Sequence, residues 1–189
     1  MIIAAKKRDV ALLGLPDTPG GYAEDVAPIV TTTRARYGES EWRAVVLTHE
    51  LHGHLGLYSL LGAKMGIRAL EEFGEEEHPL SIGSYAGQQP PISCLNDGLQ
   101  VATGSTFGHG LIHLLETEVP RPEAEFRTKK RGIRIALCRE RLEQLQCDIA
   151  EGILQHGERT PAYWRYIRSL AIRYWQEWDR HTIFSVERL

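Results

Sequence analysis

The sequence predicts an α+β fold, in which a mixed sheet packs with helices in a single core domain that is followed by a C-terminal helical extension. Three observations indicate this class. Apolar residues recur at helical spacing in some segments, and they alternate as in strands in others. The two kinds of segment are interleaved without the regular strand–helix alternation of a doubly wound sheet. The chain of 189 residues has room for one domain with a sizeable appendage, so two large independent folds are not expected.

The first elements along the chain are an irregular arm and a long helix. Residues 1–40 show no sustained period and contain the turn-forming segment 16–21, so we expect an N-terminal arm that wraps the domain or a second protomer. The core domain is expected over residues 41–137, and the C-terminal helices over residues 138–189 should pack on it.

Apolar residues at helical spacing predict a helix from about Gly56 to Phe73, which Gly74 ends. Gly62 and Gly66 lie one turn apart within it. Glycine lowers helix propensity, so this pair predicts a close approach by another backbone.

Short elements are expected between this helix and the C-terminal extension. They are a strand over 80–86, a loop over 87–91, a short helix over 94–101, a glycine-rich turn over 104–110, a strand over 111–115, and a hairpin that joins 124–127 to 133–137. These short strands supply the sheet of the predicted fold.

Two helices are expected in the C-terminal extension. The first carries the apolar stripe Cys138, Leu142, Leu145, Ile149 and Ile153. The second starts at Thr160-Pro161, an N-cap followed by proline at the first helical position, and presents Tyr163, Ile167, Leu170 and Tyr174 on one face. Its remaining aromatic residues, Trp164, Trp175 and Trp178, need a second surface to cover them.

Composition excludes several classes of protein. Hydrophobic residues make up 42% and charged residues 25%, values typical of packed domains, which excludes general disorder. The net charge of -3 argues against nucleic-acid binding by a broad basic surface. No apolar run is long enough for a membrane helix, and no signal-peptide core follows the N-terminal residues 1–8. We therefore expect a cytoplasmic protein without nucleic-acid or membrane partners.

Cysteine and histidine usage points to the candidate site. The three cysteines, Cys94, Cys138 and Cys147, are too few and too scattered for a disulfide framework. The eight histidines are many for this length, and their clustering is more informative than their number. His49, His52 and His54 form one cluster, and His109 and His113 form another.

The segment His52-Gly53-His54 is suited to metal binding. If it is extended, the two imidazoles point the same way, and the glycine lets the backbone approach an ion or a substrate. His49 and His52 share a face only if the segment is helical. The zinc-protease motif is absent, because Gly53 stands where that motif has its second histidine.

Cys94 and Asp97 are three residues apart, so they share one face of the predicted short helix. The N-terminus of a helix stabilises a thiolate, which suits metal ligation or nucleophilic attack. Asp97 could hold the second nitrogen of a histidine ligand, or act as a base. Residues 104–110 could cradle an anion with their N–H groups, and His109 or His113 could be a further ligand or a proton relay.

At these residues the sequence resembles the FmdE family, which takes its name from a component of formylmethanofuran dehydrogenase. The family's motifs are His-Gly-His-x-Cys-Pro-Gly, Cys-x-x-Asp and Thr-Gly-Cys-Thr-x-Gly-Lys-Gly. They correspond here to His-Gly-His-Leu-Gly-Leu-Tyr at 52–58, Cys-Leu-Asn-Asp at 94–97 and Thr-Gly-Ser-Thr-Phe-Gly-His-Gly at 103–110. Order and spacing agree over roughly residues 45–140, with weaker likeness in the C-terminal helices.

The resemblance implies an α+β core, commonly a homodimer, with a metal site in a cleft near the first two motifs. By position, His52, His54, Cys94 and Asp97 are the matching polar residues. The sequence departs from the motifs at three other positions: Gly56 and Ser105 replace cysteines, and His109 replaces the lysine. Losing two thiols removes soft ligands, so a metal site would be richer in nitrogen and oxygen, or lost. His49 and His109 could supply replacements.

The leading hypothesis is a metal-dependent enzyme or accessory protein that acts on a small molecule. Zinc or another divalent transition metal would lie on His52, His54 and Cys94, with Asp97 or His109 as proton carrier and one open coordination position. The second hypothesis is a metal-free module that binds an anionic small molecule at residues 104–110. The third makes Cys94 a nucleophile with a histidine base.

Overall fold

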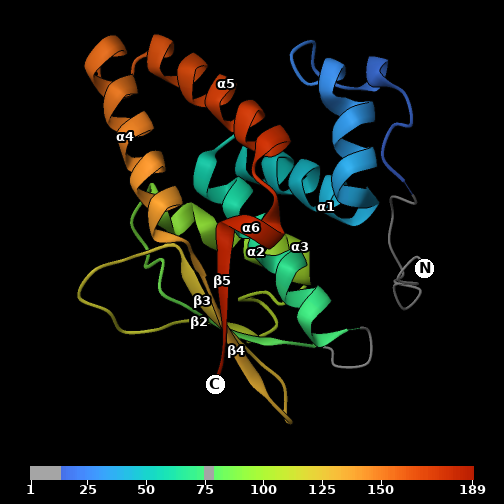
Figure 1. The fold of residues 1–189 in the computed structure, drawn as a ribbon, viewed down its shortest axis with the longest axis vertical. Helices are drawn as coiled ribbons and strands as arrows, with labels where there is room; N and C mark the ends of the chain where they lie inside the picture. The colour runs from blue at the N-terminus through green and yellow to red at the C-terminus, as the bar shows by residue number, and fades with distance from the viewer. Residues whose placement is uncertain (1–13, 75–78) are drawn as a thin grey trace.

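The computed structural model describes residues 14–74 and 79–189, and it confirms the α+β class. The first part of the predicted arm, residues 1–13, lies outside the described residues. The helices are α1 (Val30–His52), α2 (Leu57–Phe73), α3 (Leu95–Thr103), α4 (Arg139–His156), α5 (Pro161–Glu177) and α6 (Arg180–Ile183) (Figure 1). The strands are β1 (Ser81–Ser84), β2 (Ile112–Leu114), β3 (Glu123–Arg127), β4 (Gly132–Leu137) and β5 (Phe184–Arg188).

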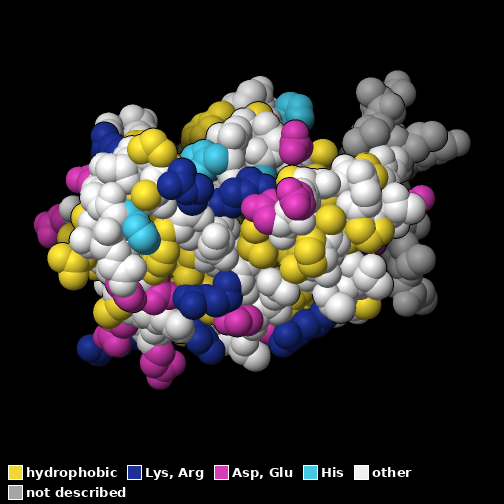
Figure 2. Space-filling view, turned by 90° about the horizontal axis from the view of Figure 1, so that it is seen from above, with side chains coloured by type: hydrophobic (Ala, Val, Ile, Leu, Met, Phe, Trp, Pro, Cys, Tyr) yellow, Lys and Arg dark blue, Asp and Glu magenta, His cyan; other side chains and the backbone are white. Residues whose placement is uncertain are grey.

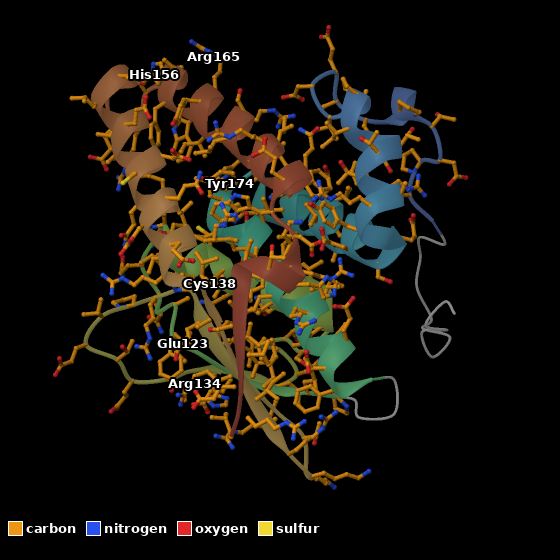
Figure 3. The ribbon with its side chains drawn as sticks, viewed as in Figure 1. Glu123, Arg134, Cys138, His156, Arg165 and Tyr174 are labelled. Atoms are coloured by element: carbon orange, nitrogen blue, oxygen red, sulfur yellow. The ribbon has the colours of Figure 1, made fainter. Side chains whose placement is uncertain are left out.

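The sheet is mixed and has the strand order β2-β1-β3-β4-β5. β1 pairs in parallel with β2, whereas β1 with β3, β3 with β4, and β4 with β5 are antiparallel. Alternate residues of these strands are buried in the core that α2 and α3 also line: Ile82, Ala124, Phe126, Ile133 and Ile135. The other face carries charged side chains such as Glu123 and Arg134, which Figure 3 labels. This alternation is typical of a sheet with one buried face.

The N-terminal region is more helical than the sequence predicts. Residues 14–29 contain only short 3₁₀ turns, η1 (Pro19–Gly21) and η2 (Ala27–Ile29), but α1 begins at Val30 and runs across residue 40. Gly38 interrupts α1 with φ 86° and ψ 164°, a conformation that favours glycine. This break removes the single helical period from the pattern, which explains why α1 was not predicted.

The α2–α3 contact confirms the predicted close approach of another backbone. A Cβ atom added to Gly62 would lie 2.1 Å from the carbonyl oxygen of Leu95, and one added to Gly66 would lie 2.6 Å from Ala102 Cβ. Gly98 on α3 is equally close to α2, since an added Cβ would meet the Ala63 nitrogen at 2.3 Å. Small residues on both helices therefore set where α3 lies.

At the C-terminal end the predicted helix over 161–177 is confirmed, and the side chain of Thr160 accepts a hydrogen bond from Tyr163 N as its N-cap. Trp175 stacks on Trp42 with ring centroids 4.3 Å apart, which supplies the second surface that this indole needed. The chain then forms α6 and β5. β5 was not predicted, because its five residues form a strand only by pairing with β4.

Over residues 14–74 and 79–189, no helix combines the length and the apolar character needed to cross a membrane.

Candidate functional site

The histidine cluster lies where α1 ends. His49 and His52 belong to the last turns of the helix, and Gly53 ends it in the left-handed conformation with φ 81°. The extended conformation expected for 52–54 is therefore wrong, and His49 shares a helical segment with His52. The turn at Gly53 nevertheless brings the rings of His52 and His54 together, with centroids 4.3 Å apart.

His52 and Asp97 form the central pair of the site. Asp97 lies in the first turn of α3, and its Oδ2 is 2.7 Å from His52 Nδ1. The His52 side chain is 10% exposed and that of Asp97 is 35% exposed. A carboxylate accepts the hydrogen bond, so Nδ1 donates the proton and Nε2 keeps its lone pair in the neutral ring. This is the contact expected of a carboxylate that orients a histidine.

The lone pair of His52 Nε2 is buried and has no hydrogen-bond partner among the described residues. It faces Gly56, because a Cβ added there would lie 3.2 Å from Nε2 and 2.8 Å from Ser59 Oγ. Gly56 is the position where the family's motif has a cysteine. The glycine leaves open the space next to Nε2 that a cysteine side chain would enter.

His54 extends the cluster toward the surface. Desolvation by the surrounding protein lowers the pKa of His54, and the neighbouring His52 lowers this pKa further. Its ring meets Trp164 edge-on, with centroids 5.3 Å apart. Trp164 is 45% exposed. A row of three rings therefore leads from the Asp97 contact to solvent.

Cys94 lies at the N-cap of α3 and is half-buried. Burial raises the pKa of its thiol, and the negative charge of Asp97 raises it further. The expectation that the helix N-terminus stabilises a thiolate here is wrong, because desolvation and a nearby carboxylate outweigh the helix dipole. This weakens the hypothesis that Cys94 is a nucleophile.

The described residues fit a metal ion incompletely. His52 presents an oriented, buried nitrogen without a partner, and the ring of His54 is beside it. However, across 14–74 and 79–189 no group of three or more His, Cys, Asp or Glu side chains is placed to hold a metal ion. The three predicted ligands His52, His54 and Cys94 are thus not gathered around one point, and we derive no chemical step through a metal.

The glycine-rich turn lies at the other end of α3. His109 is exposed, and its Nδ1 is 3.4 Å from the carbonyl oxygen of Gly104, the C-cap of α3. At the helical rise, Gly104 is about 10 Å along α3 from Asp97. The structure therefore does not bring His109 next to the His52–Asp97 pair. His113 is also exposed, on β2.

The N–H groups of this turn are largely used within the turn. Those of residues 104, 105, 107, 109, 110 and 111 all donate to nearby oxygen atoms. Ser105 is fully buried, and its Oγ donates to the Leu80 carbonyl at 2.7 Å. Few donors remain for a ligand, so the predicted anion cradle at 104–110 is not supported.

Two hollows adjoin the cluster instead. The first has a volume of about 490 Å³ and lies between residues 15–26, α1 and α5, and the second, of about 400 Å³, lies beside Trp164. Both are lined by His54, Leu55 and Arg168. Figure 2 shows Lys or Arg side chains next to His side chains in the middle of this face of the molecule.

The charges of the two hollows differ. Arg168 donates two hydrogen bonds to Asp25, at 2.5 and 2.7 Å, and these lower the pKa of Asp25. Arg165 lines the second hollow, is exposed, and has no ion-pair partner among residues 14–74 and 79–189. Figure 3 shows it near the outer end of α5. These arginines were not singled out from the sequence, although Arg168 follows Trp164 by one helical turn.

His49 makes the stability of the fold sensitive to acid. Burial lowers the pKa of its imidazole to about 3, whereas a histidine in an unfolded chain titrates near about 6.5. Between these values the unfolded state binds a proton that the folded state does not, so the free energy of unfolding falls as pH decreases. From about pH 7 to about pH 4, the protein should lose about 3 kcal/mol more than His49→Gln does, by urea unfolding.

The exposed His113 provides the control for this experiment, because His113→Gln should follow the unsubstituted protein at every pH. If His49→Gln loses as much stability on acidification as the unsubstituted protein, His49 is not the acid-sensitive group.

Known proteins similar to this chain fall into three groups. A family model described as "FmdE, Molybdenum formylmethanofuran dehydrogenase operon" matches residues 51–185. A protein of Archaeoglobus fulgidus named "Probable S-adenosyl-L-methionine-binding protein" is 39% identical over 75 residues, which are 38% of this chain and 20% of that protein. The chain thus spans about a fifth of the length of this curated relative. Among solved structures, an FmdE-like protein of tungsten formylmethanofuran dehydrogenase from Syntrophus aciditrophicus is similar over 79% of this chain and 71% of its own, with a TM-score of 0.49 and 18% identity.

Proposed function

The chain belongs to the FmdE family, and from this premise we propose that it binds a divalent transition metal and a small molecule at the histidine cluster. It would do so as a metal-dependent enzyme or as an accessory protein. The proposal includes a cytoplasmic homodimer.

One observation carries the proposal: His52 is oriented by Asp97 and presents a buried nitrogen that has no partner among the described residues. A buried, unpaired polar atom costs about 1–3 kcal/mol, so its presence favours a role that uses the lone pair. Metal-bound histidines donate their second nitrogen to a carboxylate in the same way. The same lone pair would serve as a proton acceptor for a bound molecule.

The remaining ligands proposed are His54 and Cys94, as the family motifs imply. His54 is next to His52, and desolvation favours its neutral form, which is the form that binds metals. Cys94 shares α3 with Asp97. With Gly56 and Ser105 in place of two cysteines, nitrogen and oxygen donors would dominate, and zinc would be taken more weakly than by a thiolate-rich site.

Metal analysis of the full chain, purified without a histidine tag, tests this proposal. After incubation with excess zinc and desalting, we expect close to one metal per chain by elemental analysis. His52→Ala and His54→Ala should remove it, and Asp97→Asn should weaken zinc binding about 10–100-fold, because the orienting carboxylate is lost.

His113→Ala is the matched control, since His113 is an exposed histidine on β2 that should leave the metal content unchanged. Full metal occupancy in His52→Ala, or no retained zinc in the unsubstituted protein, would show that the cluster is not a metal site.

A metal-free binding module is the second candidate function, and the hollow beside Trp164 favours it. A half-exposed indole and the guanidinium of Arg165, which has no ion-pair partner in the described part of the chain, line this hollow together with Pro161. An aromatic ring stacks on indole, and a carboxylate or phosphate pairs with guanidinium. The anionic ligand that the sequence suggested for residues 104–110 is better placed here.

S-adenosylmethionine is a suitable probe, because it carries an aromatic base and a carboxylate and appears in the name of the Archaeoglobus relative. In calorimetric titrations of chelator-treated protein, we expect saturable binding that Trp164→Ala and Arg165→Gln each weaken at least about fivefold. Leu154→Ala removes an exposed apolar side chain from α4 and should have no effect. Binding that is absent, or equal in all variants, would contradict this candidate.

A further inference from the structure

Two buried polar atoms without partners line the larger hollow. Trp175 Nε1 and His49 Nδ1 are both inaccessible to solvent and make no hydrogen bond among the described residues. Both residues line the cavity of about 490 Å³, and their ring centroids are 6.3 Å apart. His52, Cys94 and Asp97 do not line this cavity. The feature is therefore separate from the His52–Asp97 pair.

The two atoms are complementary. His49 Nε2 is 3.4 Å from the carbonyl oxygen of Gly56, which can only accept a hydrogen bond. Nε2 is therefore the protonated nitrogen, and Nδ1 is left as an acceptor. The indole nitrogen of Trp175 can only donate. One molecule with adjacent donor and acceptor atoms would satisfy both groups.

The walls of the cavity are mainly apolar and nearly neutral. Val26, Val46 and Leu55 contribute apolar surface, and the charge of Arg168 is balanced by Asp25. His49 itself is 7% exposed. The volume lies within the range typical of small-molecule sites. Part of the wall comes from residues 15–26, which precede the segment matched by the family model.

We propose that this cavity binds an uncharged small molecule that has a mostly apolar body and a carboxamide or hydroxyl group. That group accepts a hydrogen bond from Trp175 Nε1 and donates one to His49 Nδ1. The inference rests on the proposed function in one respect, since it names the class of small molecule that is bound beside the histidine cluster.

Benzamide is the probe that tests the inference, because it carries both an acceptor and a donor. Acetophenone keeps only the acceptor, and cumene keeps neither. In ligand-observed NMR titrations of the full, chelator-treated chain, benzamide should bind at least about fivefold more tightly than acetophenone, and acetophenone more tightly than cumene. Using metal-free protein separates this result from the metal analysis, so either proposal can fail alone.

Trp175→Phe removes the donor and keeps a ring stacked on Trp42, so it should weaken benzamide binding at least about fivefold. Trp178→Phe is the matched control, because Trp178 is equally buried but stacks on Tyr174 and does not line the cavity. His49→Leu, which removes the acceptor, provides a second variant if Trp175→Phe does not fold by circular dichroism. The inference is overturned if benzamide shows no saturable binding, if it binds no better than cumene, or if the folded variant binds it as tightly as the unsubstituted protein.

Discussion

Gly62→Ala is expected to destabilise the protein by about 3 kcal/mol, although alanine normally stabilises a helix by about 1 kcal/mol relative to glycine. The reason is the contact between α2 and α3. The added Cβ would lie 2.1 Å from the carbonyl oxygen and 2.9 Å from the carbonyl carbon of Leu95, and 3.1 Å from Gly98 Cα. These are backbone atoms, so the clash can be relieved only by moving α3.

The same displacement affects the site, because Asp97 lies between Leu95 and Gly98 on α3. Moving these residues away from α2 should lengthen the 2.7 Å contact between Asp97 and His52 and lower zinc affinity together with stability. Urea unfolding and zinc titration measure the two effects.

Gly108→Ala is the control for Gly62→Ala, since its added Cβ would meet only Thr106 Oγ1, at 3.8 Å. It should change the free energy of unfolding by less than about 0.5 kcal/mol. If Gly62→Ala is as stable as Gly108→Ala, the close packing of α2 on α3 is not what positions Asp97.

Glu41→Gln is expected to cost about 3–5 kcal/mol, because it leaves a buried cation without its carboxylate. Glu41 and Lys64 are both 0% exposed, and Lys64 Nζ is 2.6 Å from Glu41 Oε1. Arg180 Nη1 is 2.9 Å from Glu41 Oε2 and also pairs with Glu71. One carboxylate thus joins α1, α2 and α6, and urea unfolding should show its loss directly.

The pH dependence of Glu41→Gln identifies the cause of the loss. Burial already lowers the pKa of Lys64, and losing Glu41 removes the charge that opposes this shift. The folded variant should therefore release the Lys64 proton at a pH where the unfolded chain retains it, so its free energy of unfolding should rise with pH below about 10.5.

Glu39→Gln is the matched control, because Glu39 pairs with Arg34 at the surface and should contribute less than about 1 kcal/mol. If Glu41→Gln and Glu39→Gln cost the same, the buried network does not stabilise the fold as proposed.

The helix α2, the hairpin of β3 with β4, and the start of α5 could be predicted from sequence because each depends on local patterns: helical spacing, alternation and an N-cap. The strand β5 could not, because it requires β4 as a partner. The helical part of the predicted arm was missed because Gly38 divides the pattern of α1.

Within the candidate site, motif spacing placed Asp97 within reach of a histidine, and the structure brings it to His52. The protonation of Cys94 could not be predicted, since the helix dipole is a local property whereas burial depends on the packed protein. Nor could the separation of His109 from Asp97, which follows from their positions at opposite ends of α3.

By itself, the sequence determined the FmdE family, the α+β class and the glycine contact between two helices, because motifs, periodicity and residue size are carried by the chain itself. Tertiary structure alone decided that Lys64 is buried against Glu41, that His49 and Trp175 line one cavity, and that Arg165 faces a hollow beside His54. These features depend on segments that are distant in sequence. Their burial and hydrogen-bond partners exist only after long-range packing has excluded water.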